Sequence, residues 1–303
     1  MSSSYAEGCM KSLVTGGMGF IGSHLVKQLR ELGHTVICVD NANLPDDFHY
    51  DDSVNRVKGD IRDYALMKTL MEGVDYVFHL AAESKIGTCI DNPIQAASTN
   101  ELGTCTLLQA ARENNVKRFI YSSTSAAYGG NECPNVETQP DDCLNPYSVS
   151  KVNGEKWCKT YTDLYELKTV ILRYFNVYGP GQPTSGQYAP VMGIFTRQRD
   201  AGDPLTIVGD GEQRRDFIHV SDVARANIMA AISIQDDEYY GQVYNVGSGI
   251  NYSVNEIASM ISDNTINIPA RPGECRVTLA NYDKIHDAFG WNPQIKLDEW
   301  ING

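Results

Sequence analysis

Short runs of β-branched and other apolar residues alternate with amphipathic segments up to about residue 175. Five of these runs have the length and apolar character of buried strands, namely residues 12–15, 35–39, 74–80, 118–122 and 169–172. Segments with a helical pattern separate them. Strands that are joined through helices pair in parallel, so the pattern predicts a parallel sheet with helices on its faces.

The helical segments have identifiable ends. Between the first two strands, five apolar residues recur at helical spacing, and Gly33 stands where a helix C-terminus is expected: Ile21, Leu25, Val26, Leu29 and Leu32. Pro93, preceded by Asn92, predicts a second helix that runs to about residue 115. Pro146 predicts another helix to about residue 167. The fold class is therefore α/β, with a doubly wound parallel sheet.

The sequence changes in character after Tyr178. Glycine and proline are frequent in residues 179–186 and 202–215, which predicts an irregular, smaller C-terminal region that binds substrate. Further along the chain, the pattern predicts helices over residues 221–233 and 253–262 and a strand over residues 242–246. The second of these helices begins with Ser253 and Glu256, spaced as a capping box.

Composition narrows the classes of partner. The 303 residues are 42% hydrophobic, which suits a folded protein, and the formal net charge of −13 disfavours binding to nucleic acid or to an anionic membrane. The chain opens without a secretory signal pattern and has no long apolar stretch, so we expect a cytoplasmic protein. Eight irregularly spaced cysteines predict reduced, mostly buried thiols, and six histidines without ligand spacing predict no metal site.

A glycine-rich turn follows the first predicted strand, with glycines at positions 16, 19 and 22. Such a turn lets a pyrophosphate approach the backbone at a helix N-terminus. Asp40 ends the second strand, 24 residues after Gly16, where a carboxylate accepts from ribose hydroxyls and repels the extra phosphate of NADP. The pattern favours NAD, although an aspartate at this position could also simply cap the next turn.

Tyr147 and Lys151 lie four residues apart on a predicted helix and so project from one face. A phenol is a poor base at neutral pH, and lowering its pKa by three units takes roughly 4 kcal/mol, which a nearby ammonium can supply. Tyr64 and Lys68 have the same spacing, but no hydroxyl cluster precedes them, and we interpret them as a solvated helix face. By contrast, residues 121–124 place hydroxyl groups at the end of the strand that precedes Tyr147, where they could contact a ligand. Ordinary hydrogen bonding at a strand end is the competing interpretation of these hydroxyl groups.

These motifs together resemble the extended short-chain dehydrogenase/reductases, the NAD-dependent epimerase/dehydratase family, and most closely its nucleotide-sugar 4-epimerases. The resemblance extends from Lys11 to about Pro293. Besides the glycine turn and the Tyr147 motif, it rests on residues 59–61, 79–82, 173–180, 209–211, 215–217 and 271–274. It implies a Rossmann domain over residues 11–176 plus 216–246, and a nucleotide-sugar-binding region over 177–215 plus 247–303.

The resemblance also implies roles for individual residues. Tyr147 would be the catalytic base, Lys151 would also bond the nicotinamide ribose, and Thr124 would bridge the sugar hydroxyl. The residues implied to bind NAD are Gly16, Gly19, Phe20, Ile21, Gly22, Asp40, Asp60, Ile61, Leu80, Ala81, Ala82, Ser122, Tyr147 and Lys151. The residues implied to bind a UDP-sugar are Thr124, Asn176, Arg215, Arg271 and Glu274, the two arginines facing the diphosphate unless they form surface ion pairs.

The same resemblance bears on the reaction. Dehydratases of the family carry Asp-Glu directly after the threonine, and decarboxylases usually carry Glu at the second position, whereas this chain has Ser125 and Ala126. Return of the hydride to the opposite face of a 4-keto sugar, 4-epimerisation, is then the simplest outcome. Residues 82–86 look more like the dehydratase branch, so dehydration or decarboxylation stays an alternative.

Two further expectations concern substrate size and assembly. Thr278 stands near a position where the family's bulky tyrosine excludes N-acetyl sugars, so both UDP-hexoses and UDP-N-acetylhexosamines are candidate substrates. The resemblance implies a homodimer formed through helices over residues 96–115 and 145–167. A regulator that senses a dinucleotide without catalysis is the non-enzyme alternative, because a fold alone does not settle function.

Overall fold

The computed structural model describes residues 10–41, 54–184, 190–233, 235–270 and 275–302. Its largest element is a seven-stranded, all-parallel sheet with the strand order β10-β6-β5-β4-β1-β2-β3. The strands are β1 (Lys11–Thr15), β2 (Thr35–Asp40), β3 (Asn55–Lys58), β4 (Tyr76–His79), β5 (Arg118–Thr124), β6 (Thr169–Tyr174) and β10 (Gln242–Val246). The predicted doubly wound sheet is confirmed.

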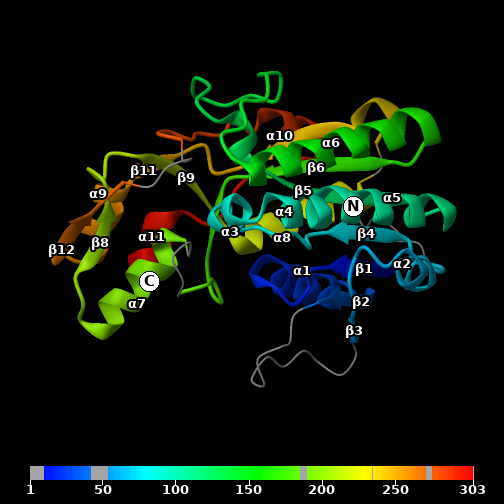
Figure 1. Cartoon of the computed structure of the whole chain (residues 1–303), viewed down its shortest axis with the longest axis horizontal. Coiled ribbons are helices and arrows are strands. Elements are labelled where there is room, and N and C mark those ends of the chain that lie inside the picture. Colours follow the sequence, from blue (N-terminus) through cyan, green and yellow to red (C-terminus); the bar gives the residue numbers. More distant parts are fainter. Residues whose placement is uncertain (1–9, 42–53, 185–189, 234, 271–274, 303) are drawn as a thin grey trace, which may run out of the picture.

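Helices cover both faces of this sheet (Figure 1). One face carries α1 (Phe20–Glu31), α8 (Val220–Ile232) and α10 (Asp283–Phe289). The other carries α2 (Tyr64–Leu70), α5 (Gly103–Glu113) and α6 (Pro146–Tyr165). The short helices α3 (Ile86–Asp91) and α4 (Pro93–Ala97) precede α5 and pack near α6.

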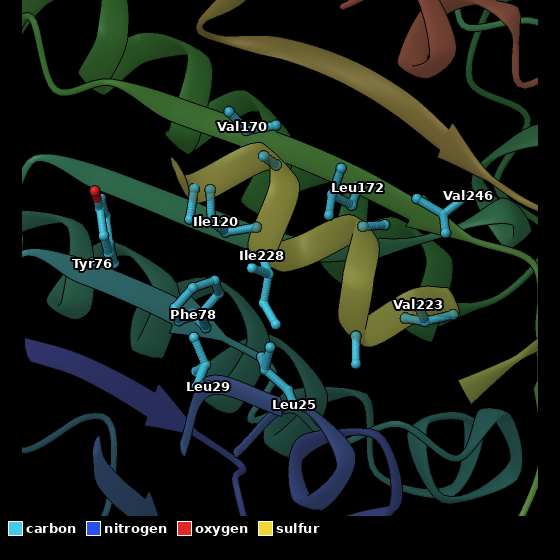
Figure 2. Close-up of a cluster of buried hydrophobic side chains, with 14 of the residues drawn as sticks. Leu25, Leu29, Tyr76, Phe78, Ile120, Val170, Leu172, Val223, Ile228 and Val246 are labelled. Carbon is cyan, nitrogen blue, oxygen red and sulfur yellow. The ribbon is translucent and has the colours of Figure 1, made fainter. Parts of the chain in front are cut away.

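Successive side chains along each strand point to opposite faces of the sheet, and an apolar core forms on each face. In Figure 2, Leu25 and Leu29 of α1 face Phe78 and Ile120 of the sheet, with Ile228 of α8 between them. Neighbours of these strand residues, such as Phe119 beside Ile120, point to the opposite core under α5 and α6. Two buried cores hold the sheet rigidly, and its strand ends are therefore a fixed platform for a site.

A smaller lobe lies at the left of Figure 1, beyond the carboxyl ends of the central strands. It contains a three-stranded sheet of β11 (Asn251–Ser253), β9 (Arg214–His219) and β7 (Asn176–Tyr178), and a parallel pair of β12 (Thr265–Ile268) and β8 (Leu205–Val208). Helices α7 (Val191–Ala201), α9 (Val254–Ile261) and α11 (Leu297–Asn302) complete it. The predicted capping box of Ser253 and Glu256 is confirmed at the start of α9.

Several sequence-based expectations differ from the structure. The region after Tyr178 is more ordered than predicted, because α7 and β8 form within it and share a separate apolar core. Strand β3 was not predicted, since its residues are polar and mostly exposed at the sheet edge. The helix predicted from Pro93 is instead α4, a π-helical turn over Ser98–Leu102 and α5.

The cysteine prediction is also wrong in part. Among the described cysteines, Cys38, Cys89 and Cys158 are buried free thiols, whereas the half-buried ones are Cys105, Cys133, Cys143 and Cys275. Tyr64 and Lys68 are confirmed as an exposed helix face, where both contact Glu113. No helix in the described ranges combines the length and the apolar character needed to cross a membrane.

Candidate active site

The glycine-rich turn joins β1 to α1 at the centre of the sheet. Gly16 has a left-handed backbone (φ +68°), and a Cβ there would come within 2.6 Å of the Ala81 backbone nitrogen. No side chain caps the N-terminus of α1 at Gly19. The turn thus brings bare backbone and a helix N-terminus to one point, which is the arrangement that accepts a pyrophosphate.

A cavity of about 770 Å³ opens over this turn. It is lined by every residue predicted to bind NAD: Gly16, Gly19, Phe20, Ile21, Gly22, Asp40, Asp60, Ile61, Leu80, Ala81, Ala82, Ser122, Tyr147 and Lys151. These residues come from the carboxyl ends of several strands and from α6, which meet because the strands are parallel. The volume and the glycine cradle fit a dinucleotide.

Two acidic residues, Asp40 and Asp60, line this cavity. Asp40 ends β2, and its carboxylate accepts from the Met18 backbone N–H at 3.2 Å. Asp60 forms a two-pronged ion pair with Arg62, and this hydrogen bonding lowers the pKa of Asp60. Sequence reasoning missed Arg62, whose guanidinium also donates to Ser98. Both carboxylates are placed where ribose or adenine groups of a dinucleotide could bind.

Helix α6 positions the tyrosine and the lysine. It starts with Asn145 as N-cap and Pro146 at the first turn, which fixes the direction of the helix beside the end of β5. Tyr147 shares a hydrogen bond with the Thr124 side chain at that strand end. Burial nevertheless raises the pKa of Tyr147 to about 12, so the phenol is protonated at neutral pH.

Lys151 lies one turn further along α6 and is almost fully buried. Its Nζ is 4.3 Å from the centre of the Tyr121 ring. Burial lowers the pKa of Lys151 to about 8, so the ammonium form still predominates at neutral pH. A cation is therefore held in a low-dielectric environment on the same helix face as the phenol.

A second cavity, of about 330 Å³, adjoins the first on the side of the smaller lobe. Thr124, Asn176, Arg215 and Thr278 line it, together with Ser125 and Ala126. Arg271 and Glu274, which were also predicted to bind the sugar nucleotide, lie outside the described residues. Among the described residues that line this cavity there is no aspartate or glutamate, although the chain as a whole is acidic.

Asn176 and Arg215 already have hydrogen-bond partners within the protein. The Asn176 amide donates to the Asp216 carbonyl oxygen at 3.1 Å and to Thr278 Oγ1 at 3.4 Å. Arg215 Nη1 donates to the backbone oxygens of Arg214 and Arg276. These contacts orient both side chains along the wall of the second cavity.

Tyr147 belongs to both cavities. It shares this position with Ser84, Lys85, Tyr174 and Pro190, which also line the two spaces. A phenol at the junction of a dinucleotide-sized cavity and a sugar-sized cavity can move a proton to or from a group that reacts with the dinucleotide. The fold and this site define a dinucleotide-dependent enzyme of the Rossmann type.

Comparison with known proteins identifies the family. The family model described as "NAD dependent epimerase/dehydratase family" matches residues 12–247, and the chain belongs to this family, whose cofactor is NAD. The resemblance inferred from the sequence motifs is therefore confirmed.

Individual relatives are similar over nearly the whole chain. The UDP-glucose 4-epimerase of Mycolicibacterium smegmatis is 33% identical over 306 residues, covering 96% of both chains. The crystal structure of UDP-glucose 4-epimerase with UDP-glucose from Thermotoga maritima is 35% identical, covers 96% of both chains and has a TM-score of 0.90. A UDP-N-acetyl-alpha-D-glucosaminuronate decarboxylase of Bacillus cytotoxicus is 36% identical, over 83% of this chain and 79% of its own. The relatives thus act on nucleotide sugars but differ in reaction.

Proposed function

We propose that this protein catalyses the NAD-dependent 4-epimerisation of a UDP-hexose or a UDP-N-acetylhexosamine. The observation that carries the proposal is the position of Tyr147, hydrogen-bonded to Thr124 at the junction of the two cavities. A sugar C4 hydroxyl in the smaller cavity would meet the phenol next to the space that fits a dinucleotide. The Tyr147 phenol, the sugar C4 and the cofactor would then lie next to one another.

In this mechanism, bound NAD supplies the hydride acceptor and donor and, in its oxidised form, a positive charge that favours the phenolate. Tyr147 removes the proton from the C4 hydroxyl as C4 is oxidised, and it returns the proton when the ketone is reduced on its other face. Thr124 orients the reacting hydroxyl through its own hydrogen bond. Lys151 keeps a positive charge on the same helix face, which lowers the cost of ionising Tyr147.

The walls of the smaller cavity favour epimerisation over dehydration and decarboxylation. Elimination of water from the sugar needs additional acid and base groups. Ser125 and Ala126 line the cavity where dehydratases place two carboxyl groups, and no described lining residue supplies one. A 4-keto sugar formed here would have hydride return as its simplest fate.

The substrate's diphosphate and its sugar substituents would meet different parts of the smaller lobe. Arg215 offers a guanidinium to the diphosphate, and we extend this role to Arg271. Asn176 and Glu274 would complete the nucleotide-sugar contacts. The small, buried Thr278 at the cavity wall supports room for an N-acetyl group. In this division, residues 11–176 plus 216–246 bind NAD, and 177–215 plus 247–303 bind the sugar nucleotide.

Proton NMR of the products tests the function. The purified protein is incubated with UDP-glucose, UDP-N-acetylglucosamine and other nucleotide sugars, with and without added NAD. We expect the C4 epimer of at least one UDP-sugar and no net formation of NADH, because the hydride returns to the sugar. A 4-keto-6-deoxy product or released carbon dioxide would assign the alternative reactions. Turnover of UDP-glucose alone would contradict the N-acetyl proposal, and binding of NAD without any turnover would favour the sensor.

A further inference from the structure

A cluster of charged and hydroxyl side chains lies directly behind the catalytic helix. Glu155 of α6 is buried one turn beyond Lys151. Its Oε1 accepts from Arg173 Nε at 2.8 Å and from Ser123 Oγ at 2.5 Å, and its Oε2 accepts from Arg173 Nη2 at 2.6 Å. We call Glu155, Arg173 and Ser123 the α6 clamp.

The α6 clamp connects three elements. Ser123 of β5 and Arg173 of β6 are directly paired in the sheet, and both side chains reach the same carboxylate on α6. Ser123 is adjacent to Thr124, whose hydroxyl contacts Tyr147. The clamp therefore fixes the spacing between the helix that carries Tyr147 and the strand that carries its hydrogen-bond partner.

Arg173 is itself restrained from several sides. Besides Glu155, it donates to Asp141 at 2.8 Å, and its guanidinium lies 4.6 Å from the centre of the Tyr128 ring. A buried ion pair adds little net stability compared with a well-packed apolar pair. Because the Arg173–Glu155 ion pair lies on the helix that carries Tyr147 and Lys151, we look for a role of this pair other than stabilisation of the fold.

The clamp also contributes charge to the surroundings of Lys151. The titratable groups around Lys151 are Tyr147, Glu155 and Cys158 of α6, Tyr121 of β5 and His79 of β4. Burial raises the pKa of Cys158 and of Tyr121 and lowers that of His79, so these three groups are neutral at neutral pH. Burial lowers the pKa of Lys151, while Cys158 and Glu155 raise it, and Glu155 is the one of these two that also belongs to the α6 clamp.

We propose that Glu155 is a positioning residue of the active site, which places its side chain one helical turn from Lys151 on α6 and holds Tyr147 against Thr124 through the α6 clamp. The proposal rests on the proposed function for its kinetic consequence. Its electrostatic consequence for Lys151 is independent of turnover and of bound cofactor.

The first test replaces Glu155 by glutamine, which keeps the size of the side chain and removes its charge. The Lys151 Cε resonance of ¹³C-lysine-labelled protein is titrated in both forms and assigned with Lys151→Arg. We expect the midpoint to fall by about one pH unit or more in Glu155→Gln, because a nearby carboxylate favours the ammonium. The alkaline limb of kcat/KM should move down by a similar amount. A folded variant with the wild-type midpoint would overturn the proposal, even if the chain proved to have no epimerase activity.

The matched control is Asp222→Asn. Asp222 is also buried, pairs with Arg225 at 2.7 Å, and lies on α8, on the opposite face of the sheet. This variant should lose stability without moving the Lys151 midpoint, whereas an equal shift would mean that the effect is only structural.

If Glu155→Gln does not fold, Ser123→Ala decides the question, because it leaves the Arg173–Glu155 pair intact. We expect kcat to fall roughly three- to tenfold, with KM changed less, since a small misplacement of reacting groups is costly. An unchanged kcat in Ser123→Ala would overturn the positioning role.

Discussion

At the scale of single residues, the site combines a phenol and an ammonium that burial pushes in opposite directions. Burial raises the pKa of Tyr147 to about 12 and lowers that of Lys151 to about 8, and each shift disfavours the charged form that the proposed reaction needs. The folded chain thus holds two ionisable groups of the proposed active site in surroundings that disfavour their charged forms.

Replacing Tyr147 with phenylalanine tests the proposed base. We expect turnover to fall by about a thousandfold or more, because no other group at the cavity junction is placed to take the C4 proton in our mechanism. Affinity for NAD, measured by calorimetry, should stay within about threefold of wild type, since the phenyl ring still fills its place. Activity near the wild-type level would remove Tyr147 from the mechanism.

Replacing Lys151 with methionine should make the protein more stable and less active. The folded-state pKa of about 8 is below the ordinary lysine pKa of 10.5, so the unfolded chain binds more protons between these values and stability rises with pH there. At pH 7 the variant should gain about 1–3 kcal/mol in urea unfolding. This gain should shrink as pH rises from 8 to 10.5. A variant that is less stable than wild type at pH 7 would contradict the burial cost.

At the scale of elements, α6 is the part of the fold on which the site depends. It packs unusually close to β5 at Gly154, where a Cβ would overlap the Tyr121 hydroxyl. That hydroxyl donates to the Lys151 carbonyl oxygen at 3.1 Å. The close approach lets the sheet contact the helix backbone between the catalytic residues and the α6 clamp.

Gly154→Ala should therefore displace α6. We expect a loss of about 1–3 kcal/mol in the free energy of unfolding, as for other overpacked cores. The kcat should fall by about tenfold or more, because Tyr147 moves relative to Thr124. The exposed neighbour Lys156→Ala provides the control and should change neither quantity appreciably. Wild-type stability and kcat in Gly154→Ala would show that the helix tolerates displacement.

The elements also show which parts of the structure can be predicted from the sequence. The residues around the larger cavity were predictable because they follow strands directly, and parallel strands bring their carboxyl ends together. The α6 clamp was not predicted, because it pairs a helix residue with a strand residue 18 positions away through side chains alone. Strand β8 was hidden for another reason: its short apolar run is surrounded by glycine and proline, which usually indicate loops.

At the scale of the whole molecule, α4, the following π-helical turn and α6 each expose a large apolar residue. Ile94, Leu102 and Leu164 are 81%, 57% and 67% exposed, and the helices and turn that carry them pack against one another. Large exposed apolar residues are typical of surfaces that another protein covers. We propose that a second copy of this chain covers this surface, as a homodimer formed through the helices over residues 96–115 and 145–167.

Light scattering coupled to gel filtration tests the assembly. The wild type should have twice the mass of one chain, and Leu102→Glu combined with Leu164→Glu should yield monomers, because charges at a buried interface are strongly unfavourable. The exposed Leu32 on the other side of the sheet provides a control, and Leu32→Glu should leave the mass unchanged. A monomeric wild type would contradict the proposal.

The residues that line both cavities have a consequence for inhibitor design. Tyr147, Ser84 and Tyr174 are among these residues and form part of the partition between the cavities, so a compound that joins a nicotinamide mimic to a sugar mimic must pass beside them. Linking the two halves raises the effective concentration of the second half once the first is bound. Such a bridging compound would gain affinity from both compartments only with a linker short enough to follow the partition.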